Sequence, residues 1–184
     1  MSERFAGSVS NRKIRILRSR NYNKCIYCGK ELGEKRSDIS IEHVIPQAVF
    51  KWTAEMLDEN ELSDLKDLCK SLDNLAVVHY SCNARKSSKI AYSQDIAKFK
   101  VDKNIKDIYN NHIAKCKKYI DNYKKLRHKV AERQDFKCAE CGKDLVLSES
   151  SIRRVDIDKP RTTDNAVVVC LKCNSRFWYN NREH

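Results

Sequence analysis

The sequence predicts an α+β protein in which two zinc-stabilised modules are joined by a long basic helix. Two stretches of the chain share one order of features: a C-x₂-C pair, an acid-bearing strand, and a second ligand pair two residues apart. Only 4 Gly and 2 Pro occur among the 184 residues, and 34% are charged, which favours helices over an all-β fold. We therefore expect modules at 1–96 and 131–184, with the connecting helix at 97–130.

Zinc is the firmest prediction from the motifs. Zn²⁺ prefers four N or S ligands in a tetrahedron, and C-x₂-C brings two thiolates to one metal from a tight turn. Gly29 and Gly142 follow the pairs and suit such a turn. The predicted ligand sets are Cys25, Cys28, His79 and Cys82 in the first module, and Cys138, Cys141, Cys170 and Cys173 in the second. Four protein ligands close each site, so both zinc ions are expected to be structural.

Cysteine usage also bears on the cellular compartment. No apolar segment opens the chain, and no run of about 18 apolar residues occurs, so neither export nor a membrane span is predicted. The nine cysteines then indicate metal binding in a reducing cytoplasm rather than disulfides. An Arg-rich, acid-poor N-terminus is also typical of a transit peptide. We prefer the cytoplasm, because the basic stretch runs directly into the first Cys pair.

Positive charge is concentrated in two parts of the chain. The net charge is +12, and residues 97–130 hold 11 Lys/Arg against 3 acids, while residues 1–46 hold 10 against 5. Such a concentration is typical of nucleic-acid binding proteins. For 97–130 alone, a solvated lysine-rich helix face is an equally good explanation.

The first module begins with a predicted basic helix at 11–20, on which Arg15, Arg18 and Arg20 are candidate DNA contacts. Arg20 precedes Cys25 by five residues, as Arg133 precedes Cys138, so the repeat is expected to extend upstream of the cysteines.

Two short strands and a helix are expected to follow. Residues 38–46 alternate polar and apolar side chains and end at a proline, which predicts a strand, and 75–79 predict its partner. A helix starting near Cys82 would complete the order strand, strand, helix. Between the strands, residues 47–72 form an acidic insertion that is predicted to be helical and is missing from the second module.

The clearest helical pattern covers 104–130. Its apolar positions recur at steps of three and four, and they are Ile105, Ile108, His112, Cys116, Tyr119, Tyr123, Leu126 and Val130. This stripe predicts burial for Cys116. Cys69 is the other thiol outside the ligand pairs and only a weak competitor for the first zinc.

Together these motifs resemble the HNH endonucleases of the ββα-metal fold, in their zinc-knuckle branch. The resemblance covers 25–46 and 72–90, and more loosely 133–176. It rests on C-x₂-C, E-H-x-x-P, D-N-L and H-x₂-C-N with a following lysine.

The resemblance implies a role for each residue of the motif. His43 is the implied general base, Glu42 and Asn83 are the implied ligands of one divalent ion, and Asn74 orients the loop that carries the histidine. Lys86 and Arg85 are implied phosphate contacts, and Lys86 is also counted among the implied catalytic residues. His79 stands where the second module has Cys170, so it is expected to bind zinc rather than act as a base.

The implied chemistry is consistent with these residue types. A histidine, with a reference pKa of about 6.5, suits proton abstraction from water at neutral pH. A carboxylate plus an amide oxygen favours Mg²⁺ or Mn²⁺ over zinc. The second module is expected to have Asp156-Ile157 in place of Glu42-His43, so it lacks a base and is interpreted as a degenerate copy.

The expected function is therefore metal-dependent cleavage of double-stranded DNA, of restriction type, with homing or phage-type nucleases as further settings. One active site per chain cuts one strand, so double-strand cleavage would require a homodimer or two encounters. The main alternative is a non-catalytic tandem zinc module that binds DNA or RNA. It explains the charge and the eight zinc ligands equally well, but not the HNH-like register in one module. A zinc deaminase is excluded, because no H-x-E is paired with P-C-x₂-C.

Overall fold

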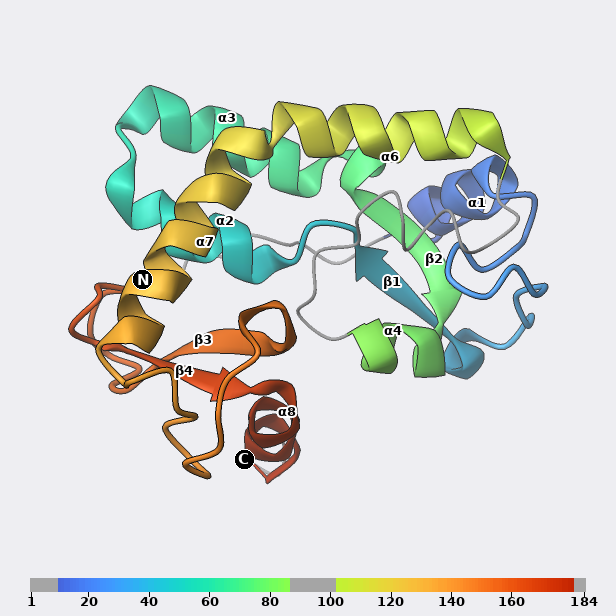
Figure 1. Cartoon of the computed structure of the whole chain (residues 1–184). Coiled ribbons are helices and arrows are strands. Elements are labelled where there is room, and N and C mark those ends of the chain that lie inside the picture. Colours follow the sequence, from blue (N-terminus) through green and yellow to red (C-terminus); the bar gives the residue numbers. More distant parts are fainter. Residues whose placement is uncertain (1–9, 87–101, 181–184) are drawn as a thin grey trace.

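Two small antiparallel sheets organise the protein (Figure 1). The structure is a computed structural model that describes residues 10–86 and 102–180, the side chains of 177–180 excepted. Its mixed helices and sheets agree with the predicted α+β class. The strands are β1 (Ile39–His43), β2 (Leu75–His79), β3 (Ser150–Arg154) and β4 (Ala166–Cys170).

Each sheet is followed directly by a helix. β1 pairs with β2, and α4 (Tyr80–Lys86) follows; β3 pairs with β4, and α8 (Leu171–Asn180) follows. We call β1, β2 and α4 the first ββα unit, and β3, β4 and α8 the second. The strand at 75–79 and the strand-strand-helix order of the first unit lie where the sequence predicted them. The predicted continuation of α4 beyond Lys86 falls outside the described residues.

Helix α1 (Asn11–Arg20) covers β2 and matches the basic helix predicted from the sequence. Ser10 caps it, because its Oγ accepts a hydrogen bond from the Lys13 N–H at 3.3 Å. Ile14 and Leu17, three residues apart, are buried on the side that packs against the sheet.

The acidic insertion is helical, as predicted. It contains α2 (Gln47–Thr53) and α3 (Glu59–Lys70). Asp58 caps α3 by accepting from the Glu61 N–H at 2.9 Å, and acidic residues in the first turn suit the positive end of the helix dipole. Single 3₁₀ turns complete the connections at Arg36–Asp38, Ala54–Met56, Leu72–Asn74 and Leu147–Glu149.

The single long helix predicted for 104–130 is wrong, because the chain bends at Cys116. Helices α6 (Lys103–Lys115) and α7 (Lys117–Glu132) meet there at an angle (Figure 1). Cys116 has φ −89° and ψ 2°, outside helical values, and its side chain is fully buried. The bend directs α7 onto α2 and β4, so the predicted apolar stripe is buried against two different parts of the protein. None of the described helices is both long enough and apolar enough to cross a membrane.

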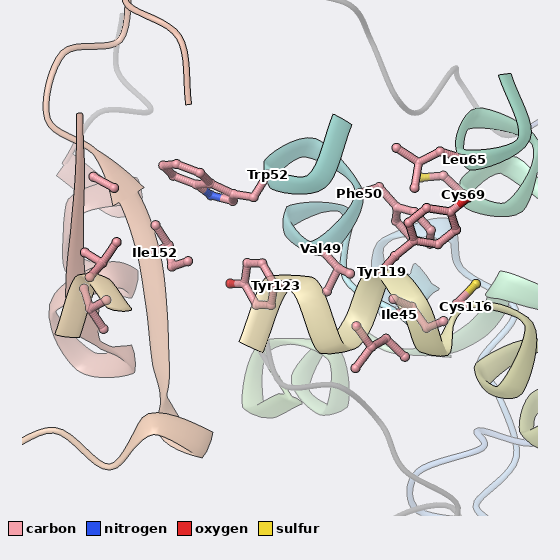
Figure 2. Packing of buried hydrophobic residues seen from close by; sticks show 14 of the residues in the cluster. Ile45, Val49, Phe50, Trp52, Leu65, Cys69, Cys116, Tyr119, Tyr123 and Ile152 are labelled. Atoms are coloured by element: carbon pink, nitrogen blue, oxygen red, sulfur yellow. The ribbon is translucent and has the colours of Figure 1, made fainter. Parts of the chain in front are cut away.

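The hydrophobic core has two clusters that do not coincide with the two ββα units. One cluster joins α1, the first sheet and α6. The other joins α2, α3 and α7 to the inner face of the second sheet, and Figure 2 shows Trp52, Tyr123 and Ile152 at this junction. The acidic insertion therefore connects the second sheet to the rest of the protein.

We expect Trp52→Ala to lower the free energy of unfolding by about 3–5 kcal/mol. Trp52 is only 4% exposed and belongs to the cluster that holds the second sheet against α2. The matched control is Met56→Ala, since Met56 is 53% exposed and should change stability by less than about 0.5 kcal/mol. Urea denaturation measures both variants, and equal stabilities would contradict this account of the core.

Candidate functional site

The predicted zinc ligands form two compact clusters. In each cluster the four ligand atoms lie within 4.8 Å of one another, and the members are Cys25, Cys28, His79 and Cys82, and Cys138, Cys141, Cys170 and Cys173. Each cluster is able to hold a metal ion, and its thiolate and imidazole donors suit zinc. His79 presents Nδ1 to the cluster, 3.2 Å from Cys28 Sγ, while its Nε2 lies 2.9 Å from the Glu31 carbonyl oxygen. A hydrogen bond from Nε2–H to that carbonyl leaves Nδ1 free as a ligand, so His79 is unsuited to act as a base.

The two C-x₂-C turns have the same geometry. Cys25 N–H donates to the Lys30 carbonyl at 2.9 Å, and Cys138 N–H donates to the Lys143 carbonyl at 2.8 Å. The glycines that follow have φ of +69° (Gly29) and +68° (Gly142), a conformation that disfavours side chains. The predicted turn role of both glycines is confirmed.

The repeat also extends upstream of the cysteines, as predicted. The Arg20 guanidinium donates to the Leu75 carbonyl and lies 3.7 Å from Asp73. At the equivalent place, Arg133 donates to the Ala166 carbonyl at 2.7 Å and lies 3.5 Å from Asp164. Both arginines thus tie the chain before the first cysteine to the start of the second strand.

The register of the second unit corrects the sequence alignment. The Asn74 carbonyl accepts from Val44 N–H at 2.8 Å and its Oδ1 from Ile45 N–H at 2.9 Å. Asn165 accepts in the same way from Val155 N–H at 3.1 Å and Asp156 N–H at 2.8 Å. Asp156 is therefore the counterpart of Ile45, not of Glu42.

The counterpart of Glu42-His43 is Arg153-Arg154. The strand pairings agree, because Glu42 faces Ala76 and His43 faces Leu75, while Arg153 faces Val167 and Arg154 faces Ala166. The prediction that Asp156-Ile157 occupies this place was wrong. It aligned Pro160 with Pro46, but the loop after β3 is three residues longer up to its proline. Both the acid and the histidine are replaced by arginine in the second unit.

Glu42 is buried against a lysine and a tyrosine. Only 4% of Glu42 is exposed; its Oε1 forms an ion pair with Lys86 Nζ and accepts from the Tyr27 hydroxyl at 3.3 Å. Burial raises the pKa of Glu42, and the neighbouring ammonium of Lys86 opposes that shift. Lys86 Nζ also donates to the His43 carbonyl at 2.7 Å. Lys86 Nζ therefore binds the acid and a backbone carbonyl, whereas the resemblance implied a phosphate contact.

Asn83 lies on the same face as Glu42. Its Nδ2 donates to Ser40 Oγ at 2.7 Å, and Ser40 and Glu42 are two apart in β1 while Asn83 and Lys86 are three apart in α4. Within the described chain, neither Asn83 Oδ1 nor Glu42 Oε2 takes part in a hydrogen bond. Two hard oxygen donors therefore remain available between β1 and α4.

His43 ends β1 with an uncharged ring. Burial is the main cause that lowers its pKa to about 4, and the charges of Lys86 and Lys51 add to the shift. Gln47, in the first turn of α2, places its side-chain nitrogen 3.4 Å from His43 Nε2. At neutral pH the imidazole is therefore uncharged.

Asn74 holds the backbone segment that follows His43 in place. It is fully buried, and its Nδ2 donates to the carbonyls of Ile45 at 3.3 Å and Cys69 at 3.1 Å, in addition to the bond that its Oδ1 accepts. These contacts hold the turn between β1 and α2, on which the position of His43 depends. The orienting role that the resemblance implies for Asn74 is compatible with this geometry.

We expect Asn74→Ala to lower the free energy of unfolding by about 2–4 kcal/mol, because it leaves buried backbone groups of Ile45 and Cys69 without partners. Asn165→Ala is the matched control, since Asn165 makes the same contacts with Asp156. Both variants should be destabilised in urea denaturation. Wild-type stability in either variant would contradict this account of the asparagine contacts.

The predicted DNA contacts lie in different environments. Arg15 is exposed on α1, and Arg85 is exposed on α4 with one nitrogen 3.3 Å from Cys82 Sγ. Arg18 donates to the Gly33 carbonyl and to Asn23 Oδ1 at 3.1 Å. Arg20 is largely occupied within the protein, because it also donates to the Tyr109 hydroxyl at 2.8 Å. This argues against a DNA contact by Arg20.

Three residues at the site were missed by the sequence analysis. Tyr27 lies between the first two cysteines, Ser40 lies two residues before Glu42, and Gln47 lies four residues after His43. The spacing of Ser40 was the one available signal, because alternate strand residues share a face. The contacts of Tyr27 and Gln47 depend on the folded arrangement.

Comparison with protein-family models, curated proteins and solved structures finds no match for this chain. The geometry nevertheless brings three chemically distinct groups together in one unit. A buried carboxylate, an available amide oxygen and an uncharged imidazole lie in the first ββα unit. The neighbouring cluster that could hold a metal takes His79 from β2, Cys82 from α4 and two cysteines from the turn before β1.

Proposed function

We propose that the protein is a divalent-metal-dependent DNA endonuclease of the HNH type, with structural zinc in both Cys/His clusters. One observation carries the proposal. The two ββα units are equivalent in turn, register and asparagine clamp, yet only the first has Glu42-His43 at the end of its first strand, where the second has Arg153-Arg154. A purely structural repeat gives no reason for a buried acid at that position, since burying it carries a desolvation penalty.

Glu42 Oε2 and Asn83 Oδ1 are the proposed ligands of one Mg²⁺ or Mn²⁺ ion. The donor set fits such an ion, because both atoms are hard oxygens and neither is used in a hydrogen bond within the described chain. When bound, the ion would neutralise charge on the phosphate and on the leaving 3′-oxygen. Lys86 pairs with Glu42 and opposes the effect of burial on the pKa of that carboxylate.

His43 is the proposed general base. Its imidazole accepts a proton from water while the water oxygen attacks phosphorus, and the P–O3′ bond breaks. Asn74 positions His43 through the turn that follows it, and the Gln47 side chain lies against Nε2. Arg15 and Arg85, both exposed, remain proposed contacts for the DNA backbone.

Restriction-type cleavage of double-stranded DNA is the proposed setting. A single Glu42-His43 pair per chain cuts one strand, so a double-strand break would need a homodimer or two encounters. Light scattering of the protein bound to the DNA site that it cleaves tests for a homodimer, and a monomer would contradict dimeric cleavage.

Nicking of supercoiled plasmid by zinc-loaded protein tests the proposed function. We expect open-circular or linear products with added Mg²⁺ or Mn²⁺ and none without added divalent metal, with the zinc content checked in each sample. Tight DNA binding without cleavage, across several plasmid sequences and methylation states, would instead support a non-catalytic tandem zinc module.

A further inference from the structure

We infer that Lys51, Arg154 and Arg161 form a phosphate-binding surface next to His43, to which the second ββα unit contributes two of the three cations. We call these residues the basic cluster. Its ligand would be a backbone phosphate of the DNA flanking the scissile bond. This inference rests on the proposed function and extends it, because it gives the unit that has lost the acid and the histidine a role in holding the substrate.

Helix α2 connects the cluster to the catalytic residue. Gln47 contacts His43, and Lys51 lies four residues further along the same helix, so both side chains are on one face. Lys51 therefore lies one helical turn beyond the residue that contacts the imidazole.

The second unit reaches the same place from the other side of α2. The core junction of Trp52 with Ile152 holds β3 beside α2 (Figure 2). Arg161 Nη1 lies 3.9 Å from Glu55 Oε1, in the 3₁₀ turn directly after α2. Arg154 ends β3, where His43 ends β1 in the first unit.

The three cations share one region of positive charge. Burial lowers the pKa of Lys51, and the charges of Arg161 and Arg154 lower it further; Arg154 also adds to the effect of burial on the pKa of Arg161. The three charges therefore add to one positive field beside α2.

Nearby carboxylates compensate only part of this charge. Glu55 pairs with Arg161, and Asp156 pairs with Lys159 at 3.4 Å. Arg154 donates to the neutral carbonyl of Lys159 at 3.1 Å, and within the described chain Lys51 has no hydrogen-bond or ion-pair partner. Lys51 and Arg154 thus keep uncompensated positive charges, which a phosphodiester would neutralise.

Fluorescence anisotropy with a labelled 20-base-pair duplex tests the inference. All proteins carry His43→Ala, which prevents cleavage, and no divalent metal is added. We expect Lys51→Ala and Arg154→Ala each to weaken binding about tenfold. Each should also reduce the slope of log affinity against log salt by about 1. Lys51→Arg should restore the lost affinity, since it restores the charge.

Lys143→Ala is the matched control, because Lys143 is an exposed lysine in the cysteine turn of the second unit and does not belong to the basic cluster. Zinc content and far-ultraviolet circular dichroism verify folding of every variant. Binding by the Lys51→Ala/Arg154→Ala protein equal to that of the control would overturn the inference.

The two proposals fail in different ways. If the wild type cleaves plasmid, and Lys51→Ala/Arg154→Ala cleaves and binds DNA equally well, the basic cluster alone is overturned. If DNA binding depends on the basic cluster but the wild type cleaves no DNA, the proposed nuclease activity is overturned and the proposed binding surface is retained. A wild type that neither binds nor cuts overturns both.

Discussion

His43→Ala should reduce phosphodiester cleavage about 10²–10⁴-fold, the range expected when a general base is removed. Among the described residues the one polar contact of its side chain is Gln47 at 3.4 Å, while Lys86 donates to its backbone carbonyl, so alanine leaves the other polar contacts of the fold in place. Zinc content, stability and DNA binding should therefore remain close to wild type. Rates of plasmid nicking under single-turnover conditions measure the effect.

His128→Ala is the matched control for this substitution. His128 is an exposed histidine on α7 whose ring contacts Phe136 at a centroid distance of 5.3 Å, far along the chain from the proposed site. It should cleave at the wild-type rate. A His43→Ala protein that cleaves as fast as His128→Ala would show that the base is another group.

The second large effect is expected from loss of a cluster ligand. Cys28→Ala should lower the zinc content from two ions per chain to one and remove most of the stability of the first unit. Structural zinc sites contribute about 10–16 kcal/mol of apparent binding free energy in small domains, and Cys25, Leu32 and Cys82 belong to the same buried core. Metal analysis and thermal denaturation measure the two effects.

Cys69→Ala separates ligation from burial. Cys69 is fully buried but lies outside both clusters, so its variant should keep two zinc ions and lose only about 1 kcal/mol. Two zinc ions in Cys28→Ala, or one in Cys69→Ala, would contradict the ligand assignment.

Features fixed by short-range patterns were predictable from the sequence. The ligand spacing predicted both clusters, and local alternation and periodicity predicted β2 and α1. Within each ligand pair, strand or helix the determining residues are close in sequence, so local geometry follows from spacing. The preference of zinc for four ligands then joins the two pairs of each cluster.

Features that depend on tertiary packing were not predictable. The bend at Cys116 follows from burial of α7 against α2 and the second sheet, which an uninterrupted apolar stripe does not reveal. The register of the second unit was misassigned because the loop after β3 differs in length from its counterpart. The ion pair of Lys86 with Glu42 was not predicted, because the two residues lie 44 positions apart and meet only in the folded protein.

The central claim is that Glu42 binds a catalytic divalent ion beside His43, and the Mn²⁺ dependence of nicking by Glu42→Gln tests it most directly. Glutamine keeps the shape of the side chain and an acceptor for Tyr27 and Lys86, so the fold should survive. We predict saturable Mn²⁺-dependent nicking by the wild type and a loss of at least about 10²-fold in the variant at every Mn²⁺ concentration. Nicking by Glu42→Gln with the rate and Mn²⁺ dependence of the wild type would contradict the account.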